Sequence, residues 1–276
     1  MSGLIIKYKE TTGDLDTYLE DEPWFPLVAE HTWNPETYEG TITLNEGVTE
    51  LPDFYDGQTC TYFNGYDSIT EIEFPEGLIA IKAESSVNWL SNLEKLIVPD
   101  TIECLGNYFG ANNCDQQWED PKMDLVLPTG LKKEYYEMPP SGIFDITYFK
   151  TIIFNPRKGR EYYSDGYYNF YLNGSTIMIK DAIYINCAPD AFGRDPLFIN
   201  FDLADPEQPI NVYVAEEYYD MYDFDTFFDS SQRELIANII KYNPSPEPPA
   251  KKTGFNLDNM QDKDYTIEIW DRTDRR

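Results

Sequence analysis

The chain contains few of the side chains on which enzymes most often rely. His31 is the single histidine among 276 residues, and it lies in the Trp- and Pro-rich stretch EPWFPLVAEHTWNP. Histidine is the commonest general base and a frequent metal ligand. Because its neighbours are aromatic and apolar, we interpret His31 as structural. The sequence also lacks a nucleophile elbow, a phosphate-binding loop and a Gly-rich dinucleotide turn. We therefore expect no enzyme and no catalytic residue.

The cysteines and the acidic segments do not follow the spacing of a known metal site. One histidine and four scattered cysteines without a CxxC pair cannot supply familiar zinc ligands. The segment YYDMYDFDTFFD is acidic enough for a hard cation, but its acids lack the alternate-residue spacing and the glycine of an EF-hand loop. We expect no metal and no cofactor, and Cys104 should behave as a small buried hydrophobe. The cysteines are Cys60, Cys104, Cys114 and Cys187, and the acids are Asp220, Asp223, Asp225 and Asp229.

Tyrosine is the residue type most in excess. The chain has 22 tyrosines, and five of them fall in the stretch REYYSDGYYNFYLNG. Tyrosine offers a large rigid contact area with a polar tip, so a contact surface for another protein is one interpretation. Packing of alternate tyrosines into the core is an equal alternative, and stacking on sugar rings is a third. The candidate binding residues are Tyr162, Tyr163, Tyr167, Tyr168 and Tyr171.

The charge of the chain restricts its partners. Fifty Asp and Glu residues against 21 Lys and Arg give a net charge of −29. Such a surface repels nucleic-acid phosphates and anionic membranes, so we expect no nucleic-acid binding. No apolar stretch approaches the roughly 20 residues of a membrane span. The first residues, MSGLIIKYKETTGD, lack the roughly 7–15 apolar residues of a secretory signal. We expect synthesis in the cytoplasm and no membrane insertion.

The strongest pattern is a repeat of apolar positions. ITEIEFPEGLIAIK at 69–82 and LEKLIVPDTIECLG at 93–106 share their apolar spacing 24 positions apart. Similar units recur at shifts of 24–31 residues, which gives about seven units. Repetition of burial with variable polar residues is typical of units that stack on one another. The anchor positions of the units are Leu44, Phe74, Val98, Leu127, Phe154, Ile185 and Val214.

Each unit predicts a short strand with one buried face. The apolar–polar–apolar triplet Ile72-Glu73-Phe74 has the period of a half-buried strand. A Pro or Asn then ends the strand, because proline cannot donate to a ladder. A second apolar pair, such as Leu78 and Ile81, follows the turn. Since one unit cannot bury its apolar face alone, stacking should form a solenoid, with the long spacers as loop insertions.

Residues 69–106 resemble the BspA-like leucine-rich repeat family. The phrase ITEIEFPEGLIAIK…NLEKLIVPDTIECLG carries the unit L-x-x-I-x-I/L-P-x-x-L-x-x-I of that family. The resemblance is fair at 41–52 and 122–131 and weaker beyond 149, over a total of about 41–243. Several connectors lack the usual Gly-x-x-Ala-Phe text. The resemblance implies a mainly β, leucine-rich-repeat solenoid of about seven irregular units with short strands, long loop insertions and few short helices.

Segments outside the repeats should close the two ends. Residues 1–40 contain an expected strand at Leu4–Tyr8 and an N-terminal cap of Trp24, Phe25, Leu27 and Trp33, because solenoids need capped ends. Residues 244–276 read as a proline-rich linker and a C-terminal arm with a strand at Tyr265–Trp270. The arm either folds back on its own chain or adds a strand to a neighbouring subunit. Its candidate assembly residues are Tyr265, Ile267, Ile269 and Trp270.

These observations favour a non-enzymatic structural or protein-interaction protein. Proteins of the BspA-like family are often bacterial surface adhesins, but the start of the chain shows no export signal. We therefore expect a component of a bacteriophage virion, in capsid decoration, neck or tail, with other subunits of the same particle as partners. The alternative is a bacterial surface adhesin that binds a host protein or a glycan. A polysaccharide-active enzyme, which needs only two carboxylates, is the third.

Overall fold

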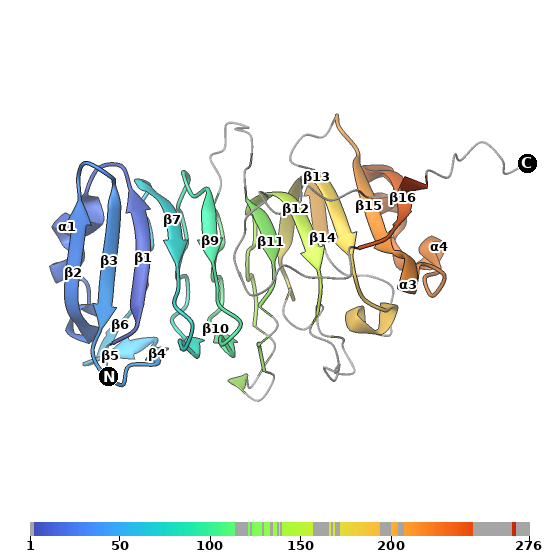
Figure 1. Cartoon of the computed structure of the whole chain (residues 1–276). Helices are drawn as coiled ribbons and strands as arrows, with labels where there is room; N and C mark the ends of the chain where they lie inside the picture. Colours follow the sequence, from blue (N-terminus) through green and yellow to red (C-terminus); the bar gives the residue numbers. More distant parts are fainter. Residues whose placement is uncertain are drawn as a thin grey trace, which may run out of the picture.

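The chain is mainly β with few short helices, as the sequence predicted. Figure 1 shows the strands following one another along one long axis, from β2 (Val28–Asn34) near one end to β16 (Ile236–Tyr242) near the other. The computed structural model describes residues 3–113, 121, 123–128, 130–132, 135–136, 138, 140–156, 166, 168, 172–193, 200–203, 207–244 and 267–268.

The N-terminal sheet contains an inserted strand. Its five strands lie in the order β2, β3 (Glu39–Leu44), β1 (Ile5–Glu10), β7 (Ile69–Glu73) and β9 (Lys95–Ile97). β1 pairs antiparallel with β3 on one side and with β7 on the other. The strands of the first two repeat units are therefore separated by β1. Within this sheet, the strands of successive units that pair directly and in parallel are β7 and β9.

A second line of contacts joins short strands on another side of the chain. β4 (Glu50–Leu51), β8 (Ala80–Ile81) and β10 (Cys104–Leu105) form a parallel sheet. The Lys132 N–H donates to the Glu103 carbonyl at 2.9 Å and extends this line by one unit. A hairpin of β5 (Phe54–Tyr55) and β6 (Gln58–Thr59) follows β4.

The C-terminal sheet has seven strands, which are parallel except for the last. Its order is β11 (Asp124–Val126), β12 (Tyr148–Phe154), β13 (Thr176–Ile185), β15 (Ile210–Ala215), β16 and β17 (Ile267–Glu268). β14 (Asn200–Leu203) pairs with the first half of β13. β17 lies antiparallel to β16, so Tyr242 faces Ile267 within the same chain.

A third line of contacts joins turns, which we call the turn ladder (residues 63–65, 85–89, 108–112 and 142–146). Alternate residues in it have positive φ, including Val87 at 54° and Trp89 at 59°. Backbone N–H groups then donate alternately to the following and the preceding unit. The Asn112 N–H reaches the Asp145 carbonyl at 2.8 Å, whereas the Gly110 N–H reaches the Ser86 carbonyl at 2.9 Å.

The middle positions of the turn ladder point into the core. Phe63, Val87 and Phe144 are buried there. Gly110 occupies the same position with a φ of 69°, and a Cβ on it would lie 2.5 Å from Cδ1 of Phe144. Glycine is therefore required at 110 both for its backbone conformation and to admit the ring of the next unit.

An aromatic spine runs through the core of the first half of the chain. Successive rings lie 5.8–6.4 Å apart from Phe63 onward, and several pairs meet edge to face. That geometry suits the ring quadrupole and adds about 0.5–1.5 kcal/mol per pair to the burial itself. The members of the spine are Trp24, Phe63, Phe74, Phe109, Phe144 and Phe149.

The predicted buried positions are confirmed. All seven anchors are at most 6 % exposed, and Cys104 is also 6 % exposed, as expected of a small hydrophobe. Trp24 is fully buried and lies in the chain between the 3-10 turns η1 (Leu19–Asp21) and η2 (Phe25–Leu27), which follow α1 (Asp14–Tyr18). Among the described residues, further short helices are η4 (Pro189–Phe192), α3 (Glu216–Tyr219), α4 (Phe224–Phe227) and α5 (Ser230–Leu235).

Candidate interaction surface

The candidate site is the outer face, by which we mean the side of the five- and seven-stranded sheets that points away from the core. Successive side chains of a strand point to opposite faces. The anchors point inward, so the residue before each anchor points outward. The same outward position therefore recurs from strand to strand along both sheets, and its residue types decide what the face can contact.

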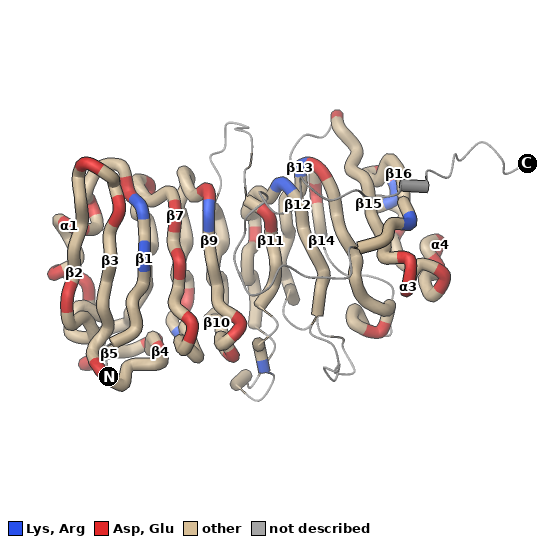
Figure 2. The backbone as a smooth tube through the Cα atoms, in the orientation of Figure 1, with Lys and Arg blue, Asp and Glu red and all other residues tan. Residues whose placement is uncertain are grey.

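The N-terminal half of the outer face is charged. Figure 2 shows charged residues along β1, β7 and β9. Lys9 Nζ lies 2.9 Å from Glu71 Oε1, and Lys95 Nζ lies 3.4 Å from Glu71 Oε2. Lys7 Nζ lies 3.0 Å from Glu73 Oε1. The ion pairs therefore link three neighbouring strands across the sheet.

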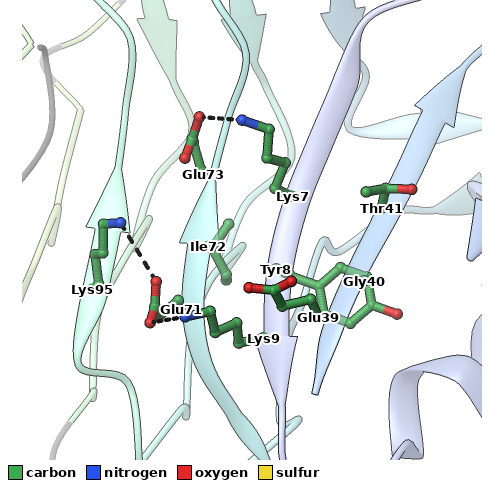
Figure 3. A pocket seen from close by; sticks show the side chains of 10 residues that line it. All are labelled: Lys7, Tyr8, Lys9, Glu39, Gly40, Thr41, Glu71, Ile72, Glu73 and Lys95. Carbon is green, nitrogen blue, oxygen red and sulfur yellow. Dashed lines mark hydrogen bonds and ion pairs between the residues drawn. The ribbon is translucent and has the colours of Figure 1, made fainter. Parts of the chain in front are cut away.

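A shallow hollow of about 330 Å³ lies among these side chains, and Figure 3 shows the residues that line it. Burial works against ionisation of Glu71, but Lys9 and Lys95 outweigh it and hold the pKa of this carboxyl below its usual range. The hydrogen bond to Glu71 raises the pKa of Lys9 in turn. The three lysines and two of the carboxylates are thus engaged with one another. Half-exposed pairs of this kind stabilise a sheet by about 0–1 kcal/mol each and fix its register.

One row of the C-terminal half of the outer face is apolar, whereas the row two residues earlier on the same strands is mostly polar, as at Asp124 and Asn211. Val126 faces Ile153, Ile153 faces Tyr184, Tyr184 faces Tyr213, and Tyr213 faces Ile240 in the register of four strand pairs. Val126 is 37 % exposed, whereas Ile240 is 6 % exposed. Ile97 occupies the same position, before its anchor, on β9. We call this row the outer stripe, and its members are Ile97, Val126, Ile153, Tyr184, Tyr213 and Ile240.

The two tyrosines of the outer stripe stack on each other. The rings of Tyr184 and Tyr213 are 4.8 Å apart and inclined by 11°, so they stack at the spacing of neighbouring strands. Tyr242 meets both rings edge to face, and its hydroxyl donates to Oδ1 of Asn186. Each of the two stacked rings covers one face of the other. They offer edges and hydroxyls to a partner, as in protein contacts, rather than an open platform for a sugar ring.

His31 lies in a chain of hydrogen-bonding groups inside the N-terminal end. Tyr8 Oη is 2.6 Å from His31 Nε2, and His31 Nδ1 is 3.5 Å from Asp16 Oδ1. Burial lowers the pKa of His31, although Asp16 opposes this shift. Tyr8 crosses β3 at Gly40, where a Cβ would lie 2.1 Å from the tyrosine ring. Tyr8 is 2 % exposed, and the group joins β1, β2 and α1.

Glu10 holds α1 against the sheet. Its carboxylate is fully buried and accepts hydrogen bonds from the backbone N–H groups of Leu15, at 2.9 Å, and Asp16, at 3.3 Å. Ser68 Oγ lies 3.5 Å away. Burial raises the pKa of Glu10, while the two backbone hydrogen bonds oppose the shift.

The raised pKa of Glu10 predicts a pH-dependent effect of Glu10→Gln. Deprotonation of Glu10 is costlier in the folded than in the unfolded chain, so its contribution to stability is lost as pH rises from about 4.3 through the folded-state value. The glutamine variant lacks this loss. Urea unfolding at pH 4 and pH 8 should show that Glu10→Gln gains stability relative to the wild type as pH rises. An unchanged or opposite difference would contradict the shift.

The acidic segment at 220–229 is used for structure. Asp223 and Asp229 cap the N-termini of α4 and α5, and Asp229 forms a capping box with Gln232. Asp220 lies 3.5 Å from Lys241, and Asp225 pairs with Arg233. Within the described part of the chain, no cluster of three or more His, Cys, Asp or Glu residues could hold a metal ion.

The predicted tyrosine cluster is described only at Tyr168. This residue is 1 % exposed, and its ring packs against Phe154 and Phe192. Tyr162, Tyr163, Tyr167 and Tyr171 lie outside the described residues. Of the predicted arm, Ile267 lies in β17, whereas Tyr265, Ile269 and Trp270 lie outside the described residues.

The outer stripe was missed by the sequence reasoning, although a signal for it exists. From the third unit on, the strands read LIV, LVL, IIF, IYI and VYV, without the polar middle residue of IEF. Such continuous apolar runs are typical of strands that are covered on both faces. The middle residue of each run points outward and belongs to the outer stripe.

The comparisons give no relative for this chain. No family model, no curated protein and no solved structure matches it. Among the described residues, no helix is long and apolar enough to cross a membrane.

Proposed function

We propose that the chain is a non-enzymatic interaction protein that binds a partner protein along the outer stripe. The single observation that supports this most is the register of four exposed or half-buried side chains across neighbouring strands, on the face that points away from the core: Val126, Ile153, Tyr184 and Tyr213. Protein contact surfaces are enriched in aromatic residues and depleted in charge at their centre. The charged N-terminal half is engaged in its own ion pairs, which directs the contact to the C-terminal half.

The scaffold for this surface is, in our proposal, a leucine-rich-repeat solenoid of the BspA-like type. Its support lies in three lines of backbone contact that recur from unit to unit: the large sheets, the small parallel sheet and the turn ladder. Units that contact only their neighbours form long, rigid surfaces that suit protein binding. β1 would then be an insertion between the first two units.

We propose a bacteriophage particle as the setting, with another subunit as the partner. This proposal rests on the sequence: an acidic body, no disulfide framework and repeats suited to protein contacts. The C-terminal arm would take part in assembly if β17 left β16 for the equivalent strand of a neighbour. A surface adhesin that binds a host protein or glycan is the alternative setting. Mass spectrometry of particles, envelope and cytosol from cells that make the chain distinguishes the two.

The binding proposal predicts that Tyr213→Ala weakens the partner without unfolding the chain. An aromatic residue at the centre of an interface typically contributes 2 kcal/mol or more, so binding should weaken at least ~30-fold. Tyr18→Ala, which removes a ring that is 54 % exposed on α1, is the matched control and should bind normally. Quantitative mass spectrometry of proteins that co-purify with each variant gives the measurement. Equal recovery of the partner by wild type and Tyr213→Ala would contradict the proposal.

A further inference from the structure

The turn ladder carries large hydrophobic side chains that the core does not use. Trp89 is 58 % exposed, Tyr108 is 45 % exposed and Ile146 is 47 % exposed. Trp89 and Ile146 occupy the last position of their turns, and Tyr108 occupies the first position of the turn between them. Backbone hydrogen bonds join the three turns, so these side chains belong to one continuous strip of surface that is separate from the outer stripe.

The backbone at these positions is unfavourable for the residues that occupy it. The φ angles are 59° at Trp89, 56° at Tyr108 and 49° at Ile146. Positive φ is uncommon for any residue other than glycine and is an outlier for a β-branched or bulky one. Glycine fills the equivalent positions at Gly65 and Gly142. The chain therefore keeps exposed hydrophobic side chains where glycine would fit the backbone better, and strained backbone of this kind is often found at functional sites.

The charged residues of this strip are all acidic. The segments 61–67, 84–92, 107–113, 141–147 and 172–176 contain no lysine or arginine and carry the carboxylates of Asp67, Glu84 and Asp145. Their hydrogen-bond donors in the described structure are neutral: Ser91 for Asp67, Asn107 for Glu84 and the Thr176 N–H for Asp145. The negative charge of all three carboxylates is therefore still available to a cation.

We infer that the turn ladder is a second interaction surface, which binds an extended basic segment of a partner protein. An arginine or lysine side chain can lie over the ring of Trp89 or Tyr108 while it pairs with Asp145 or Glu84. Ile146 offers an apolar contact to the residues between the cations. A second copy of this chain does not fit, because a net charge of −29 would bring two acidic surfaces together.

The test uses a fluorescent octapeptide of alternating arginine and glycine, with a glutamate–glycine peptide as the charge control. Binding to the full chain is followed by anisotropy at 0.15 M salt, where screening beyond about 8 Å reduces general attraction to the acidic body. Trp89→Gly should bind the arginine peptide at least 10-fold more weakly, with an unchanged or raised melting temperature because glycine accepts the backbone conformation. Asp145→Asn keeps the acceptor for Thr176 and should also weaken binding.

Phe54→Ala is the matched control, since Phe54 is 57 % exposed on the hairpin and is not a residue of the turn ladder. It should bind the arginine peptide as the wild type does. The inference would be overturned if Trp89→Gly bound the arginine peptide as tightly as the wild type does. It would also be overturned if Phe54→Ala lost as much affinity as Trp89→Gly. Either result would show attraction to the acidic surface in general. A marked drop in the melting temperature of Trp89→Gly would overturn it too, because the ring would then serve the fold.

Discussion

Replacing Phe109 by alanine should lower the free energy of unfolding by about 3–5 kcal/mol. Phe109 is fully buried in the aromatic spine. Its ring lies 6.4 Å from that of Phe74 and 5.9 Å from that of Phe144, so it joins two units of the repeat. Truncation removes the burial of one ring, leaves a cavity and breaks two ring contacts together.

Urea unfolding followed by far-ultraviolet circular dichroism measures this loss. Phe54→Ala serves as the control, because Phe54 is 57 % exposed and its truncation should change stability by no more than ~0.5 kcal/mol. A loss for Phe109→Ala no larger than that of the control would mean that the aromatic spine does not hold the units together.

Removal of residues 1–10 should prevent the N-terminal sheet from forming. Burial of Ile6 and Tyr8 on β1 is worth about 3–6 kcal/mol, at ~1.5–3 kcal/mol for each side chain. The deletion also exposes the paired edges of β3 and β7 and removes Glu10, which holds α1. Hydrogen exchange should show loss of protection in β2, β3 and β7 but not in β12 or β13.

A synthetic peptide of residues 3–10 should restore this protection, because it can pair with β3 and β7 at once. A peptide with Ile6→Asp should not, since residue 6 is fully buried. If the truncated chain unfolds at the same urea concentration as the full chain, β3 and β7 must pair directly, and β1 would be a dispensable addition.

The repeat period predicts the core well. The anchors from Leu44 to Val214 are buried, as their spacing predicted. The spacing of apolar residues indicates which positions are buried, and it does not depend on the polar residues between them. The place of β1 could not be predicted in the same way. LIIKYK has the alternation of a strand, but alternation specifies a buried face and not a neighbour, so nothing local shows that this strand separates β3 from β7.

The turn ladder and the outer stripe were harder to predict, for different reasons. A position with positive φ is usually recognised in a sequence by its glycine. Here Val87, Phe144 and Ile146 adopt positive φ, because backbone hydrogen bonds between units override the local preference. The outer stripe is visible as continuous apolar strands such as IYI and VYV. It was not predicted, since a run of apolar residues does not say which of its faces the protein itself covers.

Site-specific cross-linking can detect a partner protein bound along the outer stripe. Benzoylphenylalanine would replace Tyr213 in one chain and Tyr18 in a control chain, and both would be illuminated in the cells that make the protein. We expect one adduct of defined mass from position 213, absent when Tyr184→Ala is added, and none from position 18. Failure of position 213 to form an adduct, or the same adduct from both positions, would contradict binding along the outer stripe.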